Sequence, residues 1–299
     1  MSEEKPTRRV LRLVEARAEL MDSIWGQQKL YNHSFLCSVG LPHRKLKEGT
    51  RTYEKSSGNI SLQLTAGHIP DASGNFIPVG IPYGPKARLL LLHLCSRAVM
   101  TQDPEVEVED SFTAFARGLG LGTCGRSLSS LREQIIRTSA VSMRLAKKGE
   151  HYVETFQSPI FSHFQAEIPS DHRQKTLFPS YVRFSHEFFM SLRDHAVPLR
   201  LKAIGALTHN SRGLDIYCWL AQRLYRLKKP QRIRWTSLRF QFGSSSQDMR
   251  GFKRRFYEAL KQVLIVYPEA KVTKVDGGIM IHPSRPPVTM KPRTRGLLQ

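Results

Sequence analysis

The chain has 299 residues, which is enough for one or two domains. A hydrophobic fraction of 40% supports ordinary cores and excludes a wholly disordered protein. The formal net charge of +21 favours a polyanionic partner, such as DNA, RNA or an acidic membrane surface. This charge is uneven, because residues 151–299 hold 25 Lys and Arg against 10 Asp and Glu, whereas residues 1–150 hold 21 against 15. The second half is therefore the more basic one.

The distribution of apolar residues and cysteines argues against membrane and secreted proteins. No stretch reaches the about 18 consecutive apolar residues of a membrane span. The first residues are charged and lack the apolar centre of a secretory signal. The four cysteines are scattered without metal-ligand spacing, so neither a metal site nor a disulfide framework is predicted. A reducing cytoplasm is the expected location.

Residues 1–79 are predicted to form an N-terminal extension. Apolar residues recur at helical spacing between Val10 and Ile24. That helix either binds a partner or another copy of the chain, or packs on its own domain. Prolines and glycines recur from residue 33 to residue 83, so loops are expected there, with short extended runs such as the one at Leu62 and Leu64.

Residues 80–157 are predicted to form a first winged-helix domain. The order of helix, strand, helix, glycine-rich turn, helix and hairpin is typical of a winged helix-turn-helix. The expected elements are helices over residues 89–99, 112–119 and 127–138, a strand over 106–108, a turn over 118–125, and a hairpin of strands 140–146 and 152–156. Contacts to the DNA backbone or to a neighbouring subunit are expected from Arg126, Ser129, Ser130, Arg132, Lys147 and Lys148.

Residues 158–180 are predicted to be a linker, and the same order recurs in a second winged-helix domain over residues 181–283. Its expected elements are a strand over 181–184, a helix from Ser185 to Leu192, helices over 214–227, 237–242 and 247–267, a strand over 233–235, and a hairpin of strands 271–275 and 279–282. Residues 284–299 form a basic, proline-rich tail and are expected to be disordered. The predicted fold class is therefore α+β, with two tandem winged-helix domains.

The helix over residues 247–267 is the best-specified element. One stripe at helical spacing holds its apolar residues Met249, Phe252, Phe256, Leu260, Val263, Leu264 and Tyr267. At about 100° per residue, the opposite face carries Gln247, Arg250, Arg254 and Lys261, flanked by Lys253 and Arg255. The N-cap is expected from Ser244, Ser245 or Ser246, and Pro268 ends the helix.

The basic face of this helix favours a DNA recognition helix over a core-packed helix whose charges are merely solvated. Arg250 and Arg254 are expected to bind guanine bidentately, and Gln247 suits adenine. Lys253, Arg255 and Lys261 are expected to meet phosphates. Further candidate DNA contacts are Ser245, Ser246 and Lys274.

No enzyme constellation is evident, so no catalytic residue, metal or cofactor is predicted. Gly120, Gly122 and Gly125 match G-x-G-x-x-G, but a predicted helix precedes them, and Arg126 replaces the lysine of a phosphate loop. None of the 11 histidines forms a His-x-His pair, as in rolling-circle nickases, or a His-Glu-x-x-His motif. Asp215 is interpreted as an acid that favours the dipole of its helix.

Several strings of residues are similar to those of a known family. The most specific is Leu214-Asp215-Ile216-Tyr217-Cys218-Trp219-Leu220-Ala221-Gln222-Arg223-Leu224-Tyr225, and Ile81-Pro82-Tyr83-Gly84-Pro85-Lys86-Ala87-Arg88 adds to it. These strings resemble the plasmid-encoded RepA family of replication initiators, over roughly residues 80–288.

The resemblance implies a bacterial protein that binds repeated sequences, called iterons, at a plasmid origin. Such a protein opens the adjacent AT-rich DNA and brings in the host helicase and initiator. Initiators of this type tend to have two winged-helix domains, and a homodimer is a further expectation. The competing classes are a winged-helix transcription regulator without a replication role, a nickase or primase, and a ribosome-associated RNA binder.

Overall fold

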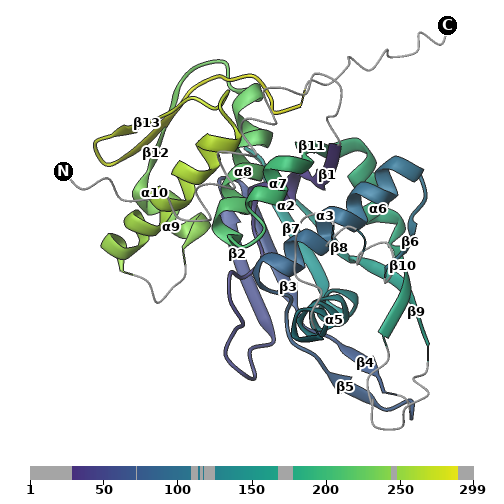
Figure 1. The fold of residues 1–299 in the computed structure, drawn as a ribbon. Helices are drawn as coiled ribbons and strands as arrows, with labels where there is room; N and C mark the ends of the chain where they lie inside the picture. The colour runs from purple at the N-terminus through teal and green to yellow at the C-terminus, as the bar shows by residue number, and fades with distance from the viewer. Residues whose placement is uncertain are drawn as a thin grey trace, which may run out of the picture.

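The computed structural model describes residues 29–71, 73–108, 114, 117, 125–167, 178–243 and 248–288. Two hydrophobic cores organise these residues, and the helix over residues 84–101 contributes to both. Figure 1 shows α9 (Trp235–Phe242) and α10 (Met249–Val266) on one side of the molecule and α6 (His186–His195) on the other.

Outside the described residues lie the helix predicted near the N-terminus, the glycine-rich turn before residue 125, and residues 289–299 of the predicted tail. Residues 284–288 of that tail are described, and the prediction of disorder is wrong for Val288, which is buried.

The C-terminal unit has the order predicted for residues 214–282. It comprises α8 (Ser211–Arg223), η1 (Leu224–Arg226), β12 (Gln231–Arg234), α9 (Trp235–Phe242), α10 (Met249–Val266), β13 (Val272–Val275) and β14 (Gly278–Ile281). The three strands form an antiparallel sheet in the order β12-β14-β13. Gly277 has a φ of 69° in the turn between β13 and β14, a conformation that glycine adopts without steric cost.

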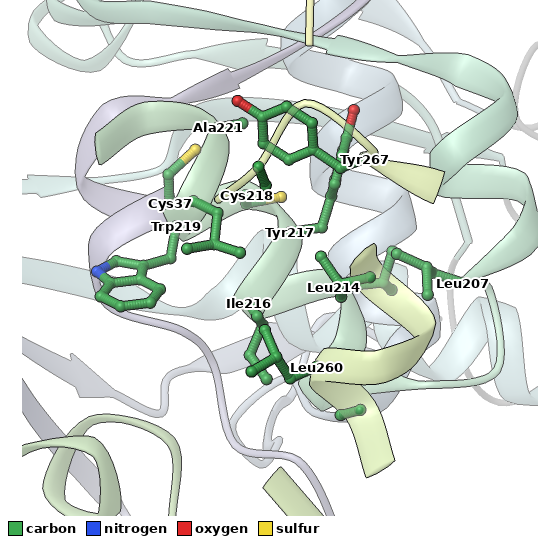
Figure 2. Close-up of a cluster of buried hydrophobic side chains, with 14 of the residues drawn as sticks. Cys37, Leu207, Leu214, Ile216, Tyr217, Cys218, Trp219, Ala221, Leu260 and Tyr267 are labelled. Carbon is green, nitrogen blue, oxygen red and sulfur yellow. The ribbon is translucent and has the colours of Figure 1, made fainter. Parts of the chain in front are cut away.

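Aromatic side chains fill the core of this unit, and Figure 2 shows part of it. Tyr217 and Tyr267 meet edge to face, with ring centroids 5.8 Å apart, and Trp219 meets Phe242 at 5.4 Å. The Tyr217 hydroxyl accepts a hydrogen bond from the backbone N–H of Arg200 at 3.0 Å. The Tyr267 hydroxyl donates to the backbone carbonyl of Arg285 at 2.7 Å, so both tyrosines have structural roles.

The N-terminal unit repeats the same sheet order with different strands from those expected. It comprises α3 (Gly84–Thr101), β6 (Glu105–Glu107), α5 (Gly125–Ala140), β9 (Phe161–Glu167) and β10 (Phe178–Phe184), and its sheet runs β6-β10-β9. In both units the strand that comes last in the chain lies in the middle of the sheet: β10 lies between β6 and β9, and β14 lies between β12 and β13. The stretch 158–180, predicted to be a linker, contains β9 and the start of β10.

The hairpin predicted as the first wing belongs to another sheet. β7 (Ser142–Lys148) and β8 (Val153–Pro159) join β2 (Thr52–Ser57) and β3 (Ile60–Thr65) in the order β2-β3-β7-β8. Leu62 pairs with Leu145 and Leu64 with Met143, so alternate residues of both strands cover one apolar face. The predicted domain boundaries stay predictions, although this pairing joins residues from both sides of residue 80.

The remaining elements complete the described part of the chain. They are β1 (Lys29–His33), which pairs with β11 (Ala196–Arg200), then α2 (Ser34–Ser38), β4 (His68–Pro70), β5 (Phe76–Pro78), α6 (His186–His195) and α7 (Leu201–Ala206). The predicted cap of α6 is present, because the Ser185 hydroxyl accepts a hydrogen bond from the Phe188 N–H. The sequence did not predict β11 and α7.

A buried ion pair joins α3 to α8 where the cores meet. Asp215 Oδ1 accepts from Arg88 Nε at 2.6 Å, and Asp215 Oδ2 accepts from Arg88 Nη2 at 2.7 Å. His43 Nε2 lies 2.8 Å from the same Oδ2. Although burial by itself raises the pKa of Asp215, the Arg88 charge and the His43 hydrogen bond outweigh it and hold this pKa at about 2. Asp215 therefore pairs with Arg88, which replaces the helix-dipole role that we expected.

Candidate nucleic-acid interface

The orientation of α10 is set by its apolar stripe. Phe252, Phe256 and Val263 are fully buried, so the helix lies against α8 and α9 with the opposite side free of the core. The rings of Phe252 and Phe256 both pack edge-on against Trp235 of α9. This packing fixes which side chains of α10 face outwards.

The N-cap of α10 is an aspartate and not one of the predicted serines. The Asp248 carboxylate accepts a hydrogen bond from the Gly251 N–H at 2.5 Å. That hydrogen bond lowers the pKa of Asp248. A side chain at position 251 would meet Asp248 at 3.0 Å and Arg255 at 3.2 Å, so glycine leaves room for the cap. Ser245, Ser246 and Gln247 lie outside the described residues.

The basic face predicted for α10 is present on its outer side. Arg250, Arg254, Arg255 and Lys261 are all exposed. Lys253 is half-buried, and its ammonium lies 5.7 Å from the centroid of the Trp235 ring. Lys253 thus flanks the face, as its position on the helix predicted.

The hairpin of β13 and β14 lies beside the same helix. The Lys274 ammonium sits 5.7 Å from the ring centroid of Tyr257, which is on α10. The exposed Lys274 therefore extends the basic surface from α10 onto the hairpin. At the other flank, Arg212 at the start of α8 donates from Nε to the Phe242 carbonyl at 3.3 Å, at the end of α9.

One acid lies among these cations, and the sequence interpretation overlooked it. Glu258 is exposed and follows Arg254 by four residues, so it shares the outer face of α10. The same helical periodicity that selected Arg250, Arg254 and Lys261 includes Glu258. A prediction based on cations alone leaves this carboxylate out, although the sequence contains the signal for it.

The candidates of the first unit lie on α5 and β7, away from α10. In α5, Ser129 and Arg132 are exposed, Ser130 is half-buried, and Leu131 and Ile135 face the core as predicted. Arg126 is the second residue of the helix, and the structure does not describe its side chain. Lys147 and Lys148 are exposed at the end of β7, where Lys147 Nζ is 4.0 Å from Glu154. Lys147 and Lys148 therefore lie on a different sheet from the one expected.

Two side chains fasten the C-terminal unit to the rest of the molecule near α10. Lys55 of β2 donates to the Gly243 carbonyl at 2.7 Å, immediately after α9. Gln241 of α9 donates to the Ser38 carbonyl at 2.8 Å. Burial lowers the pKa of Lys55. Because both hydrogen bonds hold the C-terminal end of α9, which immediately precedes the segment leading to α10, they fix the position of this end relative to the N-terminal unit.

Within the described part of the chain, no group of three or more His, Cys, Asp or Glu residues is arranged to hold a metal ion. The described helices are all too short or too polar to span a bilayer.

The family model of plasmid-encoded RepA proteins matches residues 81–237, which is more than half of the 299 residues. The chain belongs to this family. The matched span begins just before α3, contains both partners of the Arg88–Asp215 ion pair, and ends inside α9. The two strings that carry the sequence resemblance therefore meet in the fold through this ion pair. No curated protein matches the sequence.

Among solved structures, the fold of this RepA-family chain is similar to domains 2 and 3 of RctB. The crystal structure of their selenomethionine derivative has a TM-score of 0.52 at 11% identity, over 86% of this chain and 99% of that one. A second structure, of RctB residues 155–483, has a TM-score of 0.49 at 12% identity, over 83% and 94% of the two chains. The first of these supports a shared mixed α+β fold.

Proposed function

We propose that this protein is a plasmid replication initiator that binds iterons at its origin through α10. The observation that carries the proposal is the outward basic face of a helix whose other side is buried in a core. The order helix, strand, helix, helix and hairpin, with sheet order β12-β14-β13, supports a winged-helix unit as part of this proposal. Membership of the RepA family supports the replication role.

The residues of α10 divide into base readers and phosphate contacts. Arg250 and Arg254 project from the exposed face and each match the two acceptors of guanine in the major groove. Arg255 and Lys261 bind phosphates, and Lys253 and Lys274 bind them along the hairpin side. Gln247, Ser245 and Ser246 act at the start of the helix.

The first unit contributes a second, weaker DNA contact through α5 and the hairpin of β7 and β8. Its sheet order β6-β10-β9 corresponds to β12-β14-β13 of the second unit, although β7 and β8 lie between α5 and β9 in the chain. The Arg88–Asp215 pair and the Lys55–Gly243 hydrogen bond hold the two units in one arrangement. A rigid pair of units suits a long iteron that presents two successive grooves on one side of the duplex.

The same proposal includes opening of adjacent AT-rich DNA and binding of the host helicase and initiator in the cytoplasm. A homodimer is part of it, whereas catalytic activity, a metal and a cofactor are not. The competing function is transcription regulation by the same winged helices. Plasmid maintenance separates the two, because an initiator supplied in trans maintains an origin that lacks other replication genes and a regulator does not.

A footprint of the purified protein on its origin repeats, at several salt concentrations, tests the DNA-binding step. Arg254→Ala is expected to weaken binding by about 1–3 kcal/mol and to relax preference at one base position. Lys261→Ala is expected to weaken binding to all sequences alike and to reduce the salt dependence by about one counterion. An unchanged footprint in the Arg250→Ala/Arg254→Ala double variant refutes the assignment of α10.

A further inference from the structure

The exposed face of α10 holds the carboxylate of Glu258, which forms no ion pair with a described residue. Burial lowers the pKa of Arg212 at the start of α8, and the charge of Glu258 acts to raise it. Glu258 lies four residues after Arg254 and three before Lys261, positions that are neighbours on a helix surface. Within the described part of the chain, however, no Lys, Arg or His nitrogen lies within 4.0 Å of its carboxylate. An arginine that precedes a glutamate by four residues is also the weaker orientation of such a helix pair.

A free carboxylate in this place is unfavourable if the face binds only phosphates. DNA presents one negative charge per about 1.7 Å of helix axis, and a carboxylate facing it is repelled. The same group is favourable opposite a base that offers a hydrogen-bond donor. In the major groove the amino group of cytosine is such a donor, and Glu accepts from it.

We infer that Glu258 is a specificity-determining residue that accepts a hydrogen bond from a cytosine amino group while Arg254 binds a guanine. This inference rests on the proposed function of α10. Arg254 and Glu258 are four residues apart, which corresponds to a rise of about 6 Å along the helix axis. Successive base pairs are about 3.4 Å apart along the DNA axis. The guanine and the cytosine therefore lie within two base-pair steps of each other in the bound site.

The carboxylate also excludes other sequences. Where the amino group is absent, the Glu258 carboxylate faces a base acceptor or a phosphate, and both repel it. Removing the negative charge strengthens binding to random DNA and weakens discrimination between bases. Neutralising any exposed acid on this face would strengthen binding to random DNA, so the loss of discrimination is the result that separates base reading from a purely structural role.

The test is selection of bound duplexes from a library with a randomised segment, using the full chain, Glu258→Gln, Arg254→Ala and Glu187→Gln. Glu187→Gln is a charge-matched control, because Glu187 is exposed on α6, which Figure 1 shows on the opposite side of the molecule from α10. The full chain and Glu187→Gln are expected to select the same cytosine. Glu258→Gln is expected to lose about tenfold in preference at that position, or to prefer adenine, and to bind random duplex several-fold more tightly.

The outcomes separate this inference from the proposed function. If Arg254→Ala changes the selected site but Glu258→Gln selects the same bases as the full chain, the role of Glu258 is refuted and α10 remains the reader. If neither variant changes the site, both proposals fail. Circular dichroism of Glu258→Gln is expected to match that of the full chain, so a lost preference at unchanged helix content supports base reading.

Discussion

The buried Arg88–Asp215 pair gives a direct test of how the two cores are joined. Asn has the same shape as Asp but no charge, so Asp215→Asn leaves the Arg88 guanidinium buried and opposed only by neutral groups. Arg88 retains the carbonyls of Leu41, Pro42 and Gly84 as acceptors, at 2.5, 3.1 and 2.9 Å, which keeps the side chain in place. The change therefore isolates the effect of the missing charge.

The expected loss has two parts. The pKa of Asp215 is held at about 2 against an ordinary 3.8, which corresponds to roughly 2 kcal/mol in favour of the ionised carboxylate in the folded state. Removing one partner of a buried ion pair costs more, about 3–5 kcal/mol, because the other charge stays buried and unpaired. We expect a loss of about 3 kcal/mol, since the three carbonyls partly compensate for the lost charge.

The free energy of unfolding is measured by urea titration, followed by circular dichroism and by the fluorescence of Trp219 and Trp235 in the C-terminal core. Asp194→Asn is the matched control, because Asp194 is exposed on α6 and is expected to change stability by less than about 0.5 kcal/mol. Replacing Arg88 by Met in the Asp215→Asn background removes the unpaired charge and is expected to recover part of the loss.

A loss in Asp215→Asn no larger than that of Asp194→Asn would falsify the role of the ion pair. No recovery in the double variant would show that the cost lies elsewhere than in the Arg88 charge. A pH dependence follows from the same pair. Because the folded pKa of Asp215 lies below its unfolded value, its contribution is present above about pH 4 and is lost as the pH falls towards about 2.

Three further substitutions have expected outcomes. Gly40→Ala places a methyl group 2.5 Å from Asp215 Oδ2, so the Arg88–Asp215 contact must shift and the urea midpoint falls. Gly125→Ala is the control, because a Cβ there meets nothing within 4 Å. Phe256→Ala empties a fully buried site and is expected to cost about 3–5 kcal/mol of unfolding free energy, and an unchanged urea midpoint would contradict that packing. Asp248→Ala removes the cap of α10 and lowers the melting temperature, whereas Asp248→Asn retains an acceptor and is expected to lose less.

The second unit illustrates what local patterns can determine. The apolar stripe of α10 repeats with the period of a helix, so its buried and exposed faces follow from the order of residues alone. The Asp276-Gly277-Gly278 turn and the strands beside it are likewise local signals. Within this unit the notable errors were local as well, namely the identity of the N-cap and the overlooked Glu258.

The first unit illustrates what those patterns leave open. Alternation of apolar residues in 142–148 predicts a strand but does not name its partner, because any strand with a matching apolar face can complete the pair. Nearness in sequence therefore predicts the hairpin after α5 as the wing. In the structure β10 pairs with both β6 and β9, whereas β7 pairs with β3, about 80 residues earlier in the chain.

By itself, the sequence determined α3, α5, α6, α8, α9 and α10, the faces of α10 and its basic surface, and the resemblance to the RepA family, since each rests on neighbouring residues or on a continuous string. Only the tertiary structure decided which strands share a sheet and how the units are joined. Arg88 and Asp215 are 127 residues apart, and neither carries a local sign of the other. Their pairing depends on α3 and α8 being packed together, because a charge is stable in a core only where the fold places its partner.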